Sequence, residues 1–237
     1  EDEKASELAQ EIEAFNKERR STEQQVTEEA LELAKAEADC ASTVVRAPHW
    51  HKGVIGIVAS RLQATYYRPT LVFTQSGTQW AASARSVKGY DVHAAIEACQ
   101  QHLIQFGGHA YAAGITLSDA QYEPFKAAFE DHVRQTLKPE QQEPSITYDI
   151  EIEPQLLDLK TFRLLQRFQP FGPDNAEPIF LLRAVRLSQL QCVGPEGQHL
   201  RGKLGHLPFI AFKMGQQLDL AKESSVDVLV TLGMNHF

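Results

Sequence analysis

The chain has 237 residues, enough for two small domains or one large domain, and 43% of them are apolar, as is usual in soluble globular proteins. No apolar run reaches the roughly 18 residues that a membrane-spanning helix needs, so we expect no membrane association. The three cysteines are widely spaced and form no CxxC pair, which argues against a disulfide framework or a zinc site and favours a cytoplasmic protein.

The net charge of −8 is unevenly distributed along the chain. Residues 1–40 contain thirteen acidic and five basic residues, and they account for the whole acidic excess. Residues 160–213 contain eight Lys or Arg and only three Asp or Glu, a local charge of +5. This basic region is compatible with a polyanionic partner and equally with an ordinary solvated surface.

The first segment, residues 1–40, is predicted to be a long connecting helix, because no glycine or proline interrupts it. At helical spacing its apolar residues form one stripe, made of Leu8, Ile12, Phe15, Val26, Ala30 and Leu33. Arg19 lies within this stripe, where it either extends to solvent or points at an anionic group. The opening residues EDEK include no initiating Met and no cap, so we expect the chain to be a fragment.

Residues 41–138 alternate between strand and helix patterns and predict an α/β domain, a mixed sheet with flanking helices. The expected strands are 42–47, 70–74, 80–86 and 112–117, and the first expected helix is the apolar segment 53–67. Asp91 is suited to cap a second helix, and Ser118 with Gln121 suggests a capping box for a third helix that ends near residue 137.

Residues 138–145, KPEQQEPS, are the best linker candidate, and residues 139–237 are predicted to form a small β-barrel from several short strands. The chain ends directly after a strand, so the barrel is expected to lack its closing strand. Alternation along 208–214 places Phe209 on one strand face and Ile210 with Phe212 on the other. At most one of these faces is therefore available to a ligand.

The strand WAASARS presents Ser83 and Arg85 on one face and Trp80, Ala82 and Ala84 on the other. A hydroxyl and a guanidinium side by side, among small residues, are suited to hold a phosphate. The alternative is an exposed strand face with a solvated arginine.

The segment QFGGHAYAAG places Gly107, Gly108 and His109 before several small residues. The two glycines allow backbone N–H groups to approach an anion, and the imidazole can donate a hydrogen bond or carry a proton near neutral pH. The small residues Ala112, Ala113 and Gly114 suggest a strand packed tightly against a neighbour. The alternative is a helix C-cap glycine followed by a surface histidine.

His49 and His51 flank Trp50 and could form a metal site together with His109. A two-metal phosphoesterase centre, however, needs clustered carboxylates such as DxD or DHH, and the sequence has none. We therefore predict no metal-binding residues in this chain.

The ordered segments HWHKGVIGIVASRL, YRPTLVFT, SARS and GGHAYAAGITL resemble the DHH-associated domain of the DHH phosphoesterase superfamily. Together with FNKERR before them and FQPFGPDNAEPIF after them, they resemble the RecJ family of single-strand-specific exonucleases. In that family a long helix joins the catalytic DHH domain to the DHH-associated domain, and an OB-fold follows.

The resemblance implies a 5′-to-3′ exonuclease of single-stranded DNA that acts in repair and recombination and uses Mn²⁺ or Mg²⁺ held by a DHH domain absent here. It implies that Ser83 and Arg85 receive a substrate phosphate and that Gly107, Gly108 and His109 face the metals. Arg19 matches a phosphate-proximal arginine of the connecting helix, with Arg20 as the competing choice. The implied partners are single-stranded DNA and possible other repair proteins, the chain is expected to be monomeric, and alone it is expected to bind without hydrolysing.

Two other functions remain compatible with the sequence. The first is a DHH-family phosphoesterase that acts on short oligonucleotides or nucleotide phosphates, although such relatives generally end before a region like the basic segment. The second is a non-enzymatic interaction module in which the acidic helix binds a partner and GGH is only a turn.

Overall fold

A computed structural model describes residues 2–36, 39–172, 174–222 and 225–234. The chain divides into two compact units, Glu1–Pro144 and Ser145–Phe237. The division lies within the proline-containing segment 138–145. No helix among the described residues has the length and apolarity to cross a membrane.

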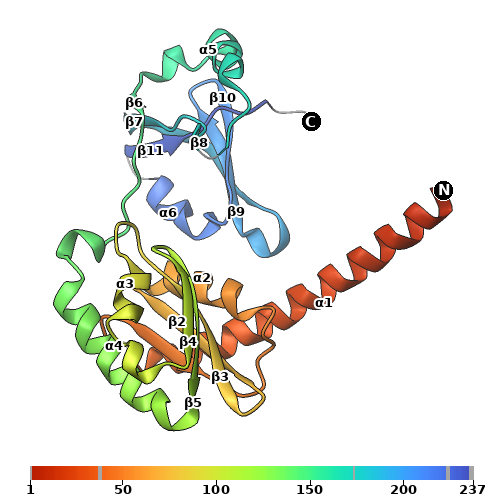
Figure 1. The fold of residues 1–237 in the computed structure, drawn as a ribbon. Helices are drawn as coiled ribbons and strands as arrows, with labels where there is room; N and C mark the ends of the chain where they lie inside the picture. Colours follow the sequence, from red (N-terminus) through yellow and green to blue (C-terminus); the bar gives the residue numbers. More distant parts are fainter. Residues whose placement is uncertain (1, 37–38, 173, 223–224, 235–237) are drawn as a thin grey trace. The chain divides into compact units, whose positions relative to one another are not determined.

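The first unit contains a five-stranded mixed sheet and four α-helices (Figure 1). Its elements in chain order are α1 (Asp2–Lys35), β1 (Thr43–Arg46), α2 (Ile55–Tyr66), β2 (Thr70–Ser76), β3 (Gln79–Arg85), α3 (Val92–Glu97), β4 (Gln105–His109), β5 (Ala112–Ser118) and α4 (Tyr122–Thr136). The strand order is β1-β2-β3-β5-β4, with β1 and β2 parallel and the other pairs antiparallel. The expected α/β architecture is confirmed.

The two faces of this sheet are covered to different extents. On one face, α3 and α4 pack against residues from β1, β2, β3 and β5 in the larger core cluster, which includes Phe73, Leu117, Phe125 and Phe129. On the other face, α1 and α2 pack against β1 and β2 through a smaller cluster that includes Val45, Leu62 and Val72. This second cluster contains no residue of β5 or β4, so among the described residues of the first unit no core cluster covers the α2 side of those strands.

Local sequence explains where several helices begin and end. Asp91 caps α3 as expected, since its Oδ1 accepts a hydrogen bond from the Ala94 amide at 2.9 Å. The capping box expected from Ser118 and Gln121 is wrong. Ser118 makes no side-chain cap bond, and a 3₁₀ turn over Asp119–Gln121 leads into α4 instead.

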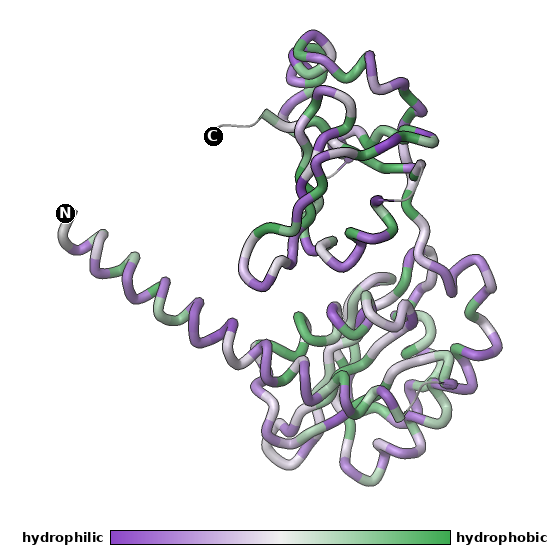
Figure 2. The backbone as a smooth tube through the Cα atoms, turned by 180° about the vertical axis from the view of Figure 1, so that it is seen from behind, coloured by the Kyte–Doolittle hydropathy of each residue, from purple (hydrophilic) through white to green (hydrophobic). Residues whose placement is uncertain are grey.

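The long helix α1 is confirmed, but only part of its apolar stripe is buried. Val26 and Ala30 lie in the core against α2, whereas Leu8, Ile12, Phe15 and Leu33 are exposed. The first turns of α1 extend away from the sheet (Figure 1), and hydrophobic residues recur there among hydrophilic ones (Figure 2). Periodicity identified the helix, but it could not identify which turns have a neighbouring element to pack against.

The second unit consists of short strands with small helices between them. Its elements are β6 (Ile150–Glu151), α5 (Leu159–Leu165), β7 (Phe180–Val185), β8 (Leu187–Val193), β9 (His199–Leu204), β10 (Leu207–Ala211), α6 (Leu218–Ala221) and β11 (Val226–Val230). They form two three-stranded sheets, β10-β9-β8 and β11-β7-β6, around a core that includes Phe180, Leu182 and Leu204.

The expected OB-like set of short strands is therefore present, but its described residues form two sheets rather than a closed barrel. Residues 178–190, which strand periodicity predicts as one strand, are divided into β7 and β8. The two halves belong to different sheets, so the chain changes sheet near Arg186.

Candidate functional site

Ser83 and Arg85 share one face of β3, as strand alternation predicted, and the structure shows that this face lies toward α2. Val72 of the α2-side core pairs with Ser83 in the β2–β3 ladder, whereas Ala82 and Ala84 belong to the core on the opposite face. The Arg85 Nη1 donates a hydrogen bond to the Ser83 Oγ at 2.9 Å. The predicted serine–arginine pair is thus formed.

Arg85 is half-buried and contacts only neutral oxygens. Its Nη1 also donates to the Ala84 carbonyl at 2.7 Å, and its Nε donates to the Ser60 Oγ at 3.1 Å. Burial lowers the pKa of the guanidinium, since taking the charge out of water disfavours the cation. Within the part of the chain that the structure describes, no carboxylate pairs with Arg85, so a bound anion would meet an uncompensated positive charge.

The structure adds two residues of α2 that the sequence reading missed. Ser60 contacts Arg85 directly, and Gly56 lies one helical turn earlier. A Cβ built on Gly56 would lie 3.0 Å from the Arg85 Nη2 and 3.3 Å from the Ser83 Oγ. The available signal was a glycine inside an otherwise apolar helix with a serine four residues later, a spacing that places both on one helix face.

The GGH segment is neither a helix cap nor a loop concavity; it forms the edge strand β4. Gly108 has φ +147°, and a Cβ there would lie 2.4 Å from the Ala112 carbonyl oxygen, so the hairpin itself requires this glycine. Gly107 is different, because a Cβ there would meet no atom within 4 Å. Packing therefore does not explain why residue 107 is glycine.

Gly114 also departs from the expectation of tight strand packing. It is exposed, and a Cβ there would come no closer than 3.8 Å to any atom, the Ala82 carbonyl oxygen. Gly107 and Gly114 are direct partners in the β4–β5 ladder, so together they leave a strip of sheet without side chains. Only Ala113 of this small-residue run lies in the core.

Strand register brings the predicted residues to one face. Arg85 pairs with Ala112, which pairs with His109, and Ser83 pairs with Gly114, which pairs with Gly107. The β3 and β4 backbones in these rows are about 10 Å apart, twice the usual strand spacing. Ser83, Arg85, Gly107, Ala112, Gly114 and His109 are hereafter called the open face.

His109 lies at the exposed edge of the open face. Its Nδ1 accepts a hydrogen bond from the Tyr111 amide at 3.3 Å. This bond favours the tautomer with a proton on Nε2, which leaves an N–H donor for a ligand oxygen.

Arg19 pairs with a carboxylate of its own helix. Its Nη1 lies 3.1 Å from the Oε2 of Glu23, whose side chain is only 5% exposed. The same carboxylate forms an ion pair with Arg61 of α2, so Glu23 links the two helices. No contact joins Arg19 to Ser83 or Arg85 among the described residues, and the competing Arg20 is exposed.

The histidines near α2 have structural partners. The His49 Nε2 and the Trp50 Nε1 both lie within 2.9 Å of the Glu29 carboxylate. The hydrogen bonds from Trp50 and then His49 lower the pKa of Glu29. In the described ranges no three His, Cys, Asp or Glu side chains are grouped as metal ligands.

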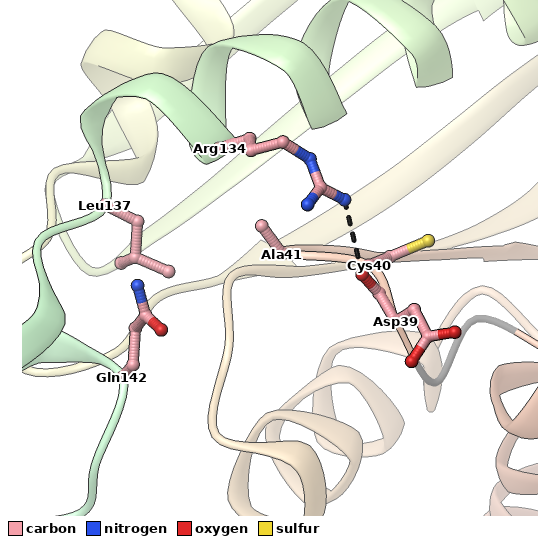
Figure 3. A pocket seen from close by; sticks show the side chains of 6 residues that line it. All are labelled: Asp39, Cys40, Ala41, Arg134, Leu137 and Gln142. Atoms are coloured by element: carbon pink, nitrogen blue, oxygen red, sulfur yellow. Dashed lines mark hydrogen bonds between the residues drawn. The ribbon is translucent and has the colours of Figure 1, made fainter.

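A small surface pocket lies elsewhere in the first unit, near the start of β1 and the end of α4 (Figure 3). Arg134 donates from Nη2 to the Asp39 carbonyl at its margin, at 3.3 Å, and also pairs with Glu130. None of its lining residues belongs to the open face.

The second unit presents basic and aromatic residues on the outer face of β9 and β10. Phe209 packs on the core while Ile210 and Phe212 are exposed, so they lie on opposite faces as alternation predicted. The Phe212 ring contacts the His199 ring edge-on, with centroids 5.3 Å apart. Arg201 is the strand partner of Ile210 in the β9–β10 ladder, so the two lie on the same face of the sheet. Not every basic residue is available, because Arg183 is paired with Glu151 and Asp227.

Comparisons with known proteins place both units. Residues 40–137 match the family model of the DHHA1 domain, and residues 148–237 match that of the RecJ OB domain. The single-stranded-DNA-specific exonuclease RecJ of Bacillus subtilis is 28% identical over 98% of this chain and 31% of its own length. RecJ of Thermus thermophilus is 31% identical over 98% of this chain and 33% of its own length.

Solved structures give the same result. The crystal structure of RecJ in complex with Mg²⁺ from Thermus thermophilus matches with a TM-score of 0.79 and 31% identity, over 96% of this chain and 35% of that one. The Mn²⁺ complex from the same organism also matches with a TM-score of 0.79. The chain spans about a third of the length of these relatives. Because it carries a DHHA1 region and a RecJ OB region and aligns with RecJ proteins over nearly its whole length, the chain belongs to the RecJ family.

Proposed function

We propose that this chain supplies the substrate-binding part of a 5′-to-3′ single-stranded-DNA exonuclease that acts in DNA repair and recombination. On this proposal the open face receives a phosphate of the strand, and the second unit binds nucleotides further along. The chain alone binds DNA and does not hydrolyse it.

The observation that carries the proposal is that the guanidinium of Arg85, the hydroxyl of Ser83 and the imidazole of His109 lie on one face of the sheet. The strip of backbone that Gly107 and Gly114 form beside them carries no side chains. Arg85 has only neutral partners among the described residues, so an anion is the missing complement to its charge. Gly107 and Gly114 leave the approach to it free of side chains.

Each residue then has a separate role. Arg85 and Ser83 hold the phosphate, Gly107 and Gly108 let it approach the backbone, and the His109 Nε2–H donates to a phosphoryl oxygen. Arg19 is the least supported member of the set, because its described ion pair is with Glu23.

The open face does not fit a metal by itself. Its charged group is a guanidinium, and its only potential metal ligand among the usual types is the single imidazole of His109. The Mg²⁺ and Mn²⁺ of the related crystal structures point to metal ligands in the part of the protein that this chain does not span. Bound there, a metal would supply Lewis-acid activation of the phosphate.

The second unit would add affinity through Phe212, Arg201 and Lys203 on the β9–β10 surface. Stacking of a base on an exposed aromatic ring contributes about 1–3 kcal/mol, and basic residues attract the backbone.

The proposal is tested by fluorescence anisotropy with the 237-residue chain and a 5′-phosphorylated single-stranded oligonucleotide. We expect wild type to bind a long single strand more tightly than a dinucleotide, and R85A and H109A to weaken binding of both. Equal affinity for the two ligands would instead favour a small nucleotide substrate. Unchanged binding by both variants would support an interaction module.

A further inference from the structure

We propose that Gly56 and Ser60 of α2 are positioning residues for the Arg85 guanidinium. On this proposal α2 is part of the phosphate site, together with the strands that carry the open face. This inference rests on the proposed function, in which Arg85 binds a substrate phosphate. Neither residue needs to touch the substrate to perform this role.

Ser60 fixes the orientation of the guanidinium. Its Oγ accepts a hydrogen bond from the Arg85 Nε at 3.1 Å and donates one to the Gly56 carbonyl, also at 3.1 Å. The hydroxyl is therefore held by its own helix while it holds Arg85. Because Nη1 is held by Ser83 and Ala84, the guanidinium is fixed at two of its three nitrogens.

The third nitrogen, Nη2, makes no hydrogen bond within the described residues. It lies beside Gly56, where an ideal Cβ would be only 3.0 Å away. Donors fixed before the ligand arrives lose less conformational freedom on binding than a mobile arginine would. The arrangement thus presents a preorganised cation to an anion.

Gly56 has no other evident reason to be glycine. It lies within a helix, where glycine lowers stability relative to alanine, and its φ is not in the left-handed region. The only atoms that a Cβ would crowd are the far ends of the Arg85 and Ser83 side chains. The absence of a Cβ at Gly56 therefore leaves space for the side chains of Arg85 and Ser83, and the backbone conformation does not require it.

Two variants of the 237-residue chain test the inference, each by anisotropy with a 5′-phosphorylated single-stranded oligonucleotide and by thermal unfolding. In G56A we expect an unchanged or higher Tm but binding about three- to tenfold weaker, since the methyl group displaces the guanidinium. S60A removes one neutral hydrogen bond and should weaken binding by a similar factor.

Thr65→Ala is the matched control, because the Thr65 Oγ1 donates to the Arg61 carbonyl of the same helix at 2.9 Å and does not contact Arg85. We expect T65A to bind as wild type. If S60A also lowers the Tm, a general loss of stability could explain its weaker binding. G56A then tests the inference, because a variant as stable as wild type can bind more weakly only through a change at the site.

A positioning role also predicts that Gly56 and Ser60 act only through Arg85. In the R85A background, G56A and S60A should have no further effect on affinity, and in S60A the Arg85 Nε–H signal in a ¹⁵N NMR spectrum should shift. Wild-type binding by G56A and S60A, with weak binding by R85A, would overturn this inference and leave the proposed function intact. Wild-type binding by R85A itself would overturn the proposed function.

Discussion

At the residue scale, Arg85 differs in the charge of its partners from the five arginines that form described ion pairs. Arg19, Arg46, Arg61, Arg134 and Arg183 each form an ion pair with a carboxylate. Arg85 is partly removed from water but contacts two hydroxyls and a carbonyl. Burying a charge without a counter-charge lowers stability, which is tolerable where a ligand later supplies the counter-charge.

The first prediction concerns Arg85→Ala. Each charge-assisted hydrogen bond to a phosphate contributes about 1.5–3 kcal/mol, so R85A should weaken single-strand binding roughly tenfold to more than a hundredfold. Its free energy of unfolding should change by less than about 1 kcal/mol, because no buried carboxylate loses a partner. Anisotropy and chemical denaturation measure the two quantities. A large loss of stability with unchanged binding would mean that Arg85 is structural.

The second prediction separates the two glycines of GGH. Gly107→Ala adds a methyl group in open space above the strip of bare backbone, so it should leave the Tm nearly unchanged and weaken binding. Gly108→Ala places a Cβ 2.4 Å from the Ala112 carbonyl oxygen and should destabilise the unit by more than about 1 kcal/mol. Equal Tm values for the two variants would contradict this assignment.

At the element scale, the connection from α1 into β1 is held by one carboxylate of α4. The Glu130 oxygens accept hydrogen bonds from the Ala41 and Ser42 amides, each at 2.8 Å, and from the Ser42 Oγ at 2.6 Å. Arg134 completes the group. Burial alone would raise the pKa of Glu130, but the bonds from Ser42, Ala41 and Arg134 outweigh it and lower the pKa.

The third prediction follows from this lowered pKa. Because the folded state holds the charged carboxylate, the stabilisation is fully present above the unfolded pKa and is lost as the pH falls through the folded one. Glu130→Gln should therefore destabilise the protein by about 1.5–3 kcal/mol near neutral pH. The difference from wild type should shrink at pH values below 4.5, the ordinary pKa of the group.

Urea denaturation across this pH range measures the effect. Glu123→Gln is the control, since Glu123 lies on the same helix but its side chain is 73% exposed. Its ion pair with Arg46, at 3.7 Å, is therefore expected to contribute little to stability. If the difference in free energy of unfolding between wild type and E130Q does not vary with pH, the hydrogen bonds from Ala41 and Ser42 do not depend on the carboxylate charge.

At the scale of the whole molecule, an acidic chain is proposed to bind a polyanion, which is possible because its charges are segregated. The acidic excess lies in residues 1–40, whereas the basic excess lies in residues 160–213. Local charge governs attraction to DNA at physiological salt, where the screening length is about 8 Å.

The fourth prediction is a salt dependence of binding. Contacts between basic residues and phosphates release counterions, so the logarithm of the association constant should fall linearly with the logarithm of salt concentration. R201A should reduce that slope by about 0.7, the value for one single-strand phosphate contact, whereas F212A should weaken binding without changing it. A flat salt titration of wild type would argue against the β9–β10 surface as a DNA contact.

The fifth prediction is that the chain alone, with Mn²⁺ added, releases no nucleotides from single-stranded DNA. The described residues contain no group of three metal ligands, and the proposal places those ligands elsewhere in the protein. Cleavage by the purified chain that is abolished in H109A would refute it, since a contaminating nuclease would not respond to that substitution.

Features that depend on residues close together in the chain could be predicted from the amino-acid pattern. The long helix, the α/β order of elements, the Asp91 cap and the pairing of Ser83 with Arg85 on one strand face all follow from local patterns, above all the helix and strand periodicities of about 3.6 and 2.0 residues. The motif order also pointed to the family that the comparisons then showed.

Which surfaces are free and which segments meet depends on contacts between distant parts of the chain, and these became visible in the fold. Cross-strand register aligned His109 with Arg85, α2 brought Ser60 against Arg85, and Glu23 engaged both Arg19 and Arg61. The fold also left four of the six residues of the α1 stripe exposed and divided the expected barrel into two sheets. These contacts join residues far apart in the chain, and local periodicity carries no information about which element will lie opposite a given face.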